Sequence, residues 1–236
     1  MRYPLYMETI KKIYKSGFGP SSSHTMGPHK AAEMFRERTP QAAAYRVTLY
    51  GSLAATGKGH HTDRAIVRGL APKEVEIVWR ADVVKPFHPN GMFFEAMDAG
   101  GGVVDSWLVY SIGGGYLATE EGEVPLGITP EGEVYPHNTM RDIMEHIDRE
   151  GLSFWEYVEQ CEDGSLWPYL EEMWQQMQQT IEQGLQDDRV IAGGLHLRSK
   201  AHQYFVRASG FKPSLQSRAL VIAYALATSE QNACGA

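Results

Sequence analysis

Cysteine is almost absent from this chain of 236 residues, which holds only Cys161 and Cys234. Two widely separated cysteines cannot form the disulfide framework of a small secreted domain, so the sequence favours a reducing compartment. A cubane iron–sulfur cluster takes about three or four cysteine ligands, and this chain cannot supply that number. We therefore expect both cysteines to be structural or incidental.

Long apolar runs and an excess of positive charge are missing as well. No stretch approaches the roughly 20 apolar residues that span a bilayer, and the N-terminus lacks the pattern of a signal peptide, which predicts a soluble, cytoplasmic protein without a membrane partner. Lys and Arg number 22 against 29 Asp and Glu, giving a formal net charge of −7. Because nucleic-acid binding requires a concentrated positive field, the sequence argues against DNA or RNA as a partner.

The apolar residues that are present, 43% of the chain, suffice for one large or two modest domains. In the first part of the chain, helical and strand patterns alternate with short turns. Helices are predicted over residues 7–15, 28–37 and 63–70, and strands over 45–50, 74–79, 102–110 and 112–119. This alternation predicts an α/β sandwich.

The composition changes after an acidic, Gly- and Pro-containing stretch at residues 120–133. Helical periodicity then dominates, over residues 140–147, 155–158, 170–185 and 215–229. The predicted fold class is therefore α+β, with an N-terminal α/β sandwich domain in residues 1–135 and an all-helical segment in residues 136–236. The last helix is apolar nearly all round, which predicts burial in a larger helical core.

Two polar segments carry most of the residues with chemical potential. The first is Gly19-Pro-Ser-Ser-Ser-His-Thr-Met-Gly-Pro28, whose serine triplet suits an anion cradle or a helix N-cap better than a helix interior. The second, Gly51-Ser-Leu-Ala-Ala-Thr-Gly-Lys-Gly-His-His-Thr-Asp63, follows the predicted strand 45–50. Two such segments suggest one site, although an ordinary capped loop before a helix also explains the first.

Together these segments resemble the signature of the iron–sulfur-dependent L-serine dehydratases, or L-serine ammonia-lyases, of the single-chain type. Further resemblances follow in the family's order along the chain, at residues 88–92, 110–115, 217–218 and 229–233. The resemblance implies that residues 1–135 form the family's beta-type domain and residues 136–236 the first helices of its alpha-type catalytic domain, which is incomplete here. It also implies L-serine as substrate, a homodimer, and a 4Fe–4S cluster whose cysteine ligands are not in this chain.

Dehydration of serine removes a weakly acidic Cα proton and expels hydroxide, which requires a base and a Lewis acid on the leaving oxygen. Histidine suits the role of base because its unperturbed pKa is about 6.5. His60 stands where the family has its Gly-Lys-Gly-His segment, so the resemblance implies that it is the base or its proton relay. His24 is the second expected catalytic residue.

The expected substrate-binding residues are Ser21, Ser22, Ser23, Thr25, Lys58, Asp63, His88 and Asn90. Hydroxyls and backbone amides of the serine run suit a carboxylate at a helix N-terminus, Lys58 would neutralise that carboxylate, and Asp63 would orient an imidazole. Plainer readings remain open: a solvated Lys58, an Asp63 that only caps a helix, and a Pro-Asn-Gly turn around Asn90. Gly193-Gly194 and Arg198 either line the site or only pack helices.

Other classes of function fit parts of the sequence. The chain would also serve as a non-catalytic amino-acid-binding or assembly module that acts with a separate cluster-bearing chain, since the family's N-terminal domain resembles a regulatory domain of a serine-pathway dehydrogenase. A metal-dependent hydrolase using His60, His61 and Asp63 rests on ligand types alone, because adjacent histidines point in different directions, and no metal-ligand set is predicted. A serine nucleophile lacks the Gly-x-Ser-x-Gly elbow.

Overall fold

The computed structural model describes residues 7–17, 19–124, 133–191, 196–209 and 214–233. The chain divides into two compact units, of which the larger comprises Gly17–Leu126 and Gln179–Ala236 and the smaller Met1–Ser16 and Gly127–Gln178. Across the described ranges, no helix is both long and apolar enough to cross a membrane. Cys234 and Gly193-Gly194, noted in the sequence, lie outside the described residues.

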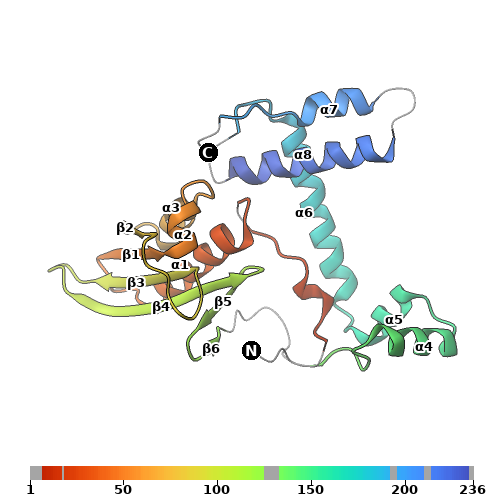
Figure 1. The fold of residues 1–236 in the computed structure, drawn as a ribbon, viewed down its shortest axis with the longest axis horizontal. Helices are drawn as coiled ribbons and strands as arrows, with labels where there is room; N and C mark the ends of the chain where they lie inside the picture. Colours follow the sequence, from red (N-terminus) through yellow and green to blue (C-terminus); the bar gives the residue numbers. More distant parts are fainter. Residues whose placement is uncertain (1–6, 18, 125–132, 192–195, 210–213, 234–236) are drawn as a thin grey trace. The chain divides into compact units, whose positions relative to one another are not determined.

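A mixed sheet in the larger unit runs in the order β2-β1-β3-β4-β5-β6 (Figure 1). Its strands are β1 (Ala44–Tyr50), β2 (Glu74–Arg80), β3 (Gly91–Met97), β4 (Val103–Gly113), β5 (Tyr116–Thr119) and β6 (Gly122–Glu123). Strands β1 and β2 pair in parallel, and the other neighbours pair antiparallel. Burial alternates along β1, where Tyr45, Val47 and Leu49 are buried, because successive side chains point to opposite faces.

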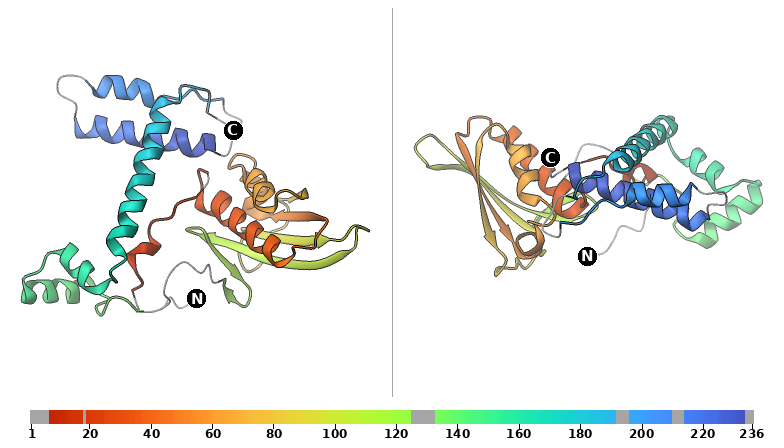
Figure 2. Two further views of the ribbon diagram at one scale, coloured as in Figure 1. Left: turned by 180° about the vertical axis from the view of Figure 1, so that it is seen from behind. Right: turned by 90° about the horizontal axis from the view of Figure 1, so that it is seen from above.

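Three helices, α1 (Gly27–Arg38), α2 (Gly51–Thr56) and α3 (Thr62–Leu70), cover one face of this sheet (Figures 1 and 2). Phe35, Leu53 and Ile66 of these helices are fully buried in one core cluster with residues of β1, β3 and β4. A Cβ atom at Gly69 would lie 2.6 Å from the Ala32 Cβ atom, so the absence of a side chain at Gly69 lets α3 approach α1 closely.

In the smaller unit, the N-terminal segment is held against the turn between α5 (Phe154–Cys161) and α6 (Leu166–Gln186). Glu162 accepts hydrogen bonds from the Thr9 hydroxyl at 2.6 Å, the Ile10 amide at 2.8 Å and the Tyr135 hydroxyl at 2.6 Å. The buried Lys11 ammonium donates to Asp163, which holds the pKa of that carboxyl well below its usual range. Helix α4 (Met140–Glu150) packs here through Ile147.

Helices α7 (Ala201–Ala208) and α8 (Leu215–Ala233) pack against each other in the larger unit. The rings of Tyr204 and Tyr224 stack with their centroids 4.6 Å apart. On α8, Val221 and Ala225 are buried, whereas Ile222 is 45% exposed. Within the described residues, the burial predicted all round this helix is therefore seen on one face only.

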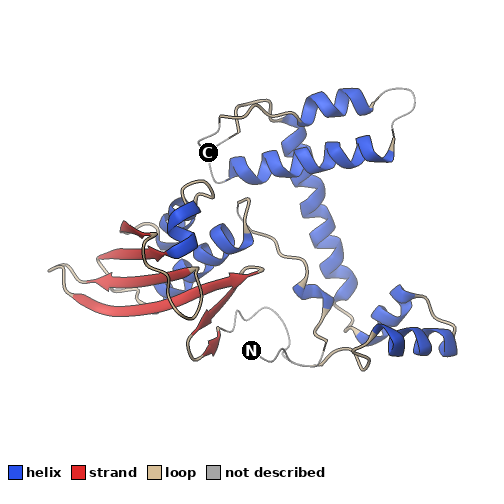
Figure 3. Cartoon of the chain, in the orientation of Figure 1, coloured by secondary structure: helices blue, strands red, loops and turns tan. Residues whose placement is uncertain are grey.

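The α+β fold class is confirmed, since the described strands lie between Ala44 and Glu123 and the elements from Met140 onward are helices (Figure 3). The predicted helix over residues 7–15 is wrong: only Ile10–Lys12 forms a 3-10 turn, because the polar contacts with Glu162 and Asp163 hold this segment. Strand β3 and helices α2 and α7 were not predicted. The division at residue 135 stays a prediction, and the two compact units do not coincide with it.

We predict that Gly69→Ala destabilises the larger unit. The added methyl would lie 2.8 Å from the His29 carbonyl oxygen, and such overpacking costs about 1–3 kcal/mol, more than the roughly 1 kcal/mol that Ala gains over Gly in a helix. Urea denaturation measures the difference in free energy of unfolding. Gly164→Ala is the control, because nothing lies within 4 Å of a Cβ there. Equal stability of the two variants would contradict the close packing of α1 and α3.

Candidate active site

The predicted site residues gather at one edge of the sheet, where β1 and β4 end and β3 begins. The Ser52 amide, just after β1, donates to the Pro89 carbonyl at 3.1 Å, and the Ser111 amide of β4 donates to the Asn90 carbonyl at 3.0 Å. The start of α1 reaches the same edge, because a Cβ at Gly27 would lie 2.4 Å from the Ser111 hydroxyl oxygen. Both polar segments and the residues 88–90 therefore meet there.

The serine run forms a helical turn in place of the expected loop. Ser22–Met26 is π-helical and continues directly into α1, and Ser21 is its N-cap, with its hydroxyl oxygen accepting the His24 amide at 3.1 Å. The N-cap role anticipated for a serine is confirmed at Ser21. Ser22 is exposed.

Two buried threonines join the histidine-bearing segments through reciprocal hydrogen bonds. The Thr25 hydroxyl donates to the His60 carbonyl at 2.9 Å, and the Thr62 hydroxyl donates to the His24 carbonyl at 2.6 Å. Both threonines are fully buried. We call this arrangement the threonine clamp. It commits the Thr25 hydroxyl as a donor to the backbone, which leaves its predicted contact with substrate without support in the geometry.

The clamp brings the two expected catalytic histidines together. The ring centroids of His24 and His60 lie 4.9 Å apart, at an interplanar angle of 82°. The Nδ1 atom of His24 lies 2.9 Å from the Ser23 hydroxyl oxygen, and its Nε2 atom lies 3.2 Å from that of Ser52. The ring nitrogens of His60 have no hydrogen-bond partner among the described residues, so they are available to a ligand.

Burial lowers the pKa of His24, and the neighbouring His60 lowers it further, while the backbone of Ser52 opposes the change. A lowered pKa keeps the imidazole neutral at pH 7, the form that accepts a proton. Burial also lowers the pKa of His88. The site therefore favours the uncharged form of His24 and of His88.

The positions of Lys58 and Asp63 fit a solvent-exposed lysine and an aspartate at the start of a helix. Lys58 is exposed, and its ammonium lies 5.6 Å from the centroid of the Trp79 ring. Asp63 lies in the first turn of α3 and accepts the Arg64 amide at 2.9 Å. Its charge raises the pKa of the buried His61, against the larger lowering by burial. Any orienting effect of Asp63 thus falls on His61, and the roles predicted for Lys58 and Asp63 remain predictions.

His88 and Asn90 form the turn that starts β3. The His88 Nδ1 atom accepts the Asn90 amide at 3.1 Å, and the Asn90 side-chain amide donates to the Ser111 carbonyl at 3.1 Å. The chain bends at Pro89 and Asn90 directly before β3, which fits the turn expected there, and the contact of His88 and Asn90 with substrate stays a prediction. Next to them, the buried Ser111 hydroxyl has no partner among the described residues.

Ser52, Thr62 and Ser111 were not predicted as site residues, although all three lie in quoted motifs. A polar residue directly after a strand end was the available signal for Ser52, because strand ends of one sheet edge lie close together. No local signal marks Thr62, whose partner is 38 positions away in the sequence.

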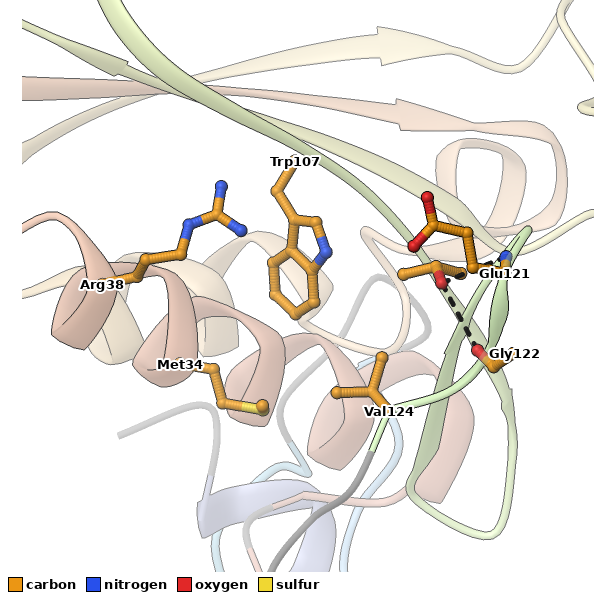
Figure 4. A pocket seen from close by; sticks show the side chains of 7 residues that line it. Met34, Arg38, Trp107, Glu121, Gly122 and Val124 are labelled. Carbon is orange, nitrogen blue, oxygen red and sulfur yellow. Dashed lines mark hydrogen bonds between the residues drawn. The ribbon is translucent and has the colours of Figure 1, made fainter.

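A separate cavity of about 330 Å³ lies at the other end of α1 (Figure 4). It is lined by Met34, Arg38, Trp107, Thr119, Glu121, Gly122 and Val124. The Arg38 guanidinium is already paired with Asp105 through two contacts of 2.8 and 2.9 Å. None of the predicted site residues lines this cavity.

The residues of this chain do not fit a 4Fe–4S cluster. Among the described residues, no group of three or more His, Cys, Asp or Glu side chains is arranged to hold a metal ion. Cys161 sits beside Tyr157, and burial raises the pKa of its thiol, which disfavours the thiolate form that metal ligation needs.

The sequence of the chain is similar to those of known proteins. Residues 9–78 and 71–122 match the family model described as serine dehydratase beta chain. The chain is 32% identical to L-serine dehydratase 2 of Escherichia coli, over 97% of this chain and 61% of that protein. The chain belongs to the L-serine dehydratase family. L-serine dehydratases of Streptomyces coelicolor (30%, over 96% of this chain) and Haemophilus influenzae (29%, over 97%) are similar too. The chain spans 61% of the length of each of these curated relatives.

We predict that the folded state loses stability as the pH falls below about 6.5, before carboxylates titrate. The folded-state pKa values of His24, His61 and His88 lie below the ordinary value of 6.5, so the unfolded chain binds more protons in this range. The free energy of unfolding therefore has its full value above about pH 6.5, where these histidines are neutral in both states. Urea denaturation between pH 7.5 and 5 measures the slope. His61→Asn should reduce the slope of the free energy of unfolding against pH, and asparagine tolerates the φ of 55° at this position. An unchanged slope would show that His61 does not cause this loss of stability.

We predict that Thr62→Val weakens the threonine clamp. Valine matches the shape of threonine but leaves the His24 carbonyl without this donor, which costs about 1–3 kcal/mol for a buried polar group. The free energy of unfolding measures the loss. Thr56→Val is the matched control, because its exposed hydroxyl bonds only within α2. Equal losses of unfolding free energy in the two variants would show that the buried hydrogen bond of Thr62 stabilises the fold no more than the exposed one of Thr56.

Proposed function

We propose that this chain provides the base and the polar frame of an L-serine ammonia-lyase, which converts L-serine to pyruvate and ammonia. The observation that carries the proposal is the pair of histidines held together by the threonine clamp within the family's motifs. Membership in the family and the names of the relatives support the same reaction. We place the protein in the cytoplasm, as a homodimer.

In this proposal, the His60 imidazole takes the Cα proton of bound L-serine. Its ring nitrogens are open to a ligand, and a neutral His24 beside it adds no competing positive charge. Loss of the Cα proton and of the β-hydroxyl as hydroxide leaves aminoacrylate, which tautomerises to an imine. Water then hydrolyses the imine to pyruvate and ammonia, so no redox partner is needed.

An iron–sulfur cluster is part of the proposal as the cofactor of the complete enzyme, with cysteine ligands from outside this chain. The two cysteines present do not fit such a cluster. This chain's own residues are therefore assigned only the binding of serine and the transfer of its proton. Expulsion of the hydroxyl group falls to groups beyond them.

The cysteine count favours one alternative, an amino-acid-binding or assembly module that acts with a separate cluster-bearing chain. Calorimetric titration of the purified chain with L-serine tests the binding that both functions require. An assay for pyruvate in the presence of the cluster-bearing part of the enzyme separates them, with His60→Gln as the variant. Turnover that falls in this variant supports the lyase. Unchanged turnover favours the module, and an absence of serine binding contradicts both.

We predict that His60→Gln lowers serine turnover by about 10²–10⁴, the usual contribution of a general base, in any preparation that forms pyruvate. The binding of L-serine should change less, because the base acts on the Cα proton. His202→Gln is the control, since His202 is exposed on α7 and lies outside the site. Substantial turnover by the His60 variant would exclude His60 as the base.

A further inference from the structure

The two ring nitrogens of His24 face two hydroxyl groups with different origins. Ser23, at Nδ1, is the preceding residue, whereas Ser52, at Nε2, comes from α2. A neutral imidazole has one N–H donor and one acceptor nitrogen. One hydroxyl must therefore accept a hydrogen bond from His24 while the other donates one to it.

The backbone of Ser52 is fixed to the segment between β2 and β3 independently of His24. The Gly51 amide donates to the Val83 carbonyl at 2.9 Å, and the Ser52 amide donates to the Pro89 carbonyl at 3.1 Å. Gly51 has a φ of 49°, and a Cβ there would lie 2.5 Å from the Pro89 carbonyl oxygen, so this turn requires glycine. Ser23 lies in the same helical turn as His24, so its contact cannot fix the ring relative to another element. The contact with Ser52, in α2, can do so.

We propose that Ser52 is a positioning residue whose hydroxyl accepts a hydrogen bond from the Nε2–H group of His24. This bond fixes the tautomer of His24, leaves Nδ1 to accept from the Ser23 hydroxyl, and holds the ring at its nearly perpendicular contact with His60. The consequence for catalysis rests on the proposed function. If His60 takes the Cα proton, Ser52 acts on the base through His24 and does not touch the substrate.

The electrostatics agree with an N–H group of His24 on the side of Ser52. Burial lowers the pKa of His24, and His60 lowers it further, whereas the backbone of Ser52 raises it. An acceptor that faces an N–H group favours the protonated ring, as the Ser52 backbone does here. Ser52→Ala keeps this backbone and removes only the hydroxyl group at Nε2, so its expected effect is on the tautomer of His24.

Nuclear magnetic resonance of the purified chain with ¹⁵N-labelled histidine tests the proposal without substrate. We expect the Nε2–H tautomer of His24 in the wild-type chain. In Ser52→Ala, the population should shift toward the Nδ1–H tautomer. Ser52→Thr, which keeps the hydroxyl, should restore the wild-type signals. Ala55→Gln, a change at an exposed position of the same helix, should leave them unaltered.

A wild-type Nδ1–H tautomer, or a Ser52→Ala variant with unchanged His24 signals, would overturn the proposal. Thermal unfolding of each variant establishes that it is folded. Where serine turnover is measurable, Ser52→Ala should lower kcat about 10- to 100-fold with little change in KM, as expected for a misplaced catalytic group. Failure of the proposed lyase would leave the resonance result intact, and failure of the resonance test would leave the lyase intact, so the two are distinguishable.

Discussion

The site depends on two hydrogen bonds in which each histidine segment supplies a carbonyl to a threonine of the other. Thr25 follows His24 directly and donates to His60, while Thr62 follows His60 by two positions and donates to His24. Both hydroxyls are buried, so neither can exchange its partner for water without opening the helices α1 and α3. Gly69 permits the close packing of α1 and α3, and the two threonines lie at the N-terminal ends of these helices.

This constraint favours a neutral imidazole, the form that can act as a general base, without placing a positive charge in the site. Burial disfavours the imidazolium form of His24, and a positively charged neighbour disfavours it further. Hydroxyl groups of Ser23 and Ser52 satisfy the ring nitrogens without adding charge. The result is a pair in which His24 is hydrogen-bonded at both ring nitrogens and His60 keeps its nitrogens open among the described residues.

Periodicity and motif order predicted the α+β class, strands β1 and β2 and helices α1 and α3, because each has a strong local pattern. Strand β3 was missed because Gly91-Met-Phe-Phe-Glu-Ala-Met97 has no β-branched residue and follows a turn signal. His24 and His60 were named from their motifs, and the structure brings them together. Ser52 and Thr62 escaped prediction because their roles exist only through contacts 28 and 38 residues away along the chain.

The same geometry bears on which charges of a bound amino acid this edge can match. L-serine carries a carboxylate and an ammonium group, and a neutral His24 neither repels nor neutralises either of them. The cation predicted to meet the carboxylate, Lys58, lies over Trp79 and is exposed, which leaves its long side chain free to turn at little cost. Serine held by hydroxyls and backbone groups would leave its Cα proton to the open nitrogens of His60. The clamp thus places two histidines with different roles side by side. His24 is fixed by contacts at both ring nitrogens, whereas the ring nitrogens of His60 have no partner among the described residues.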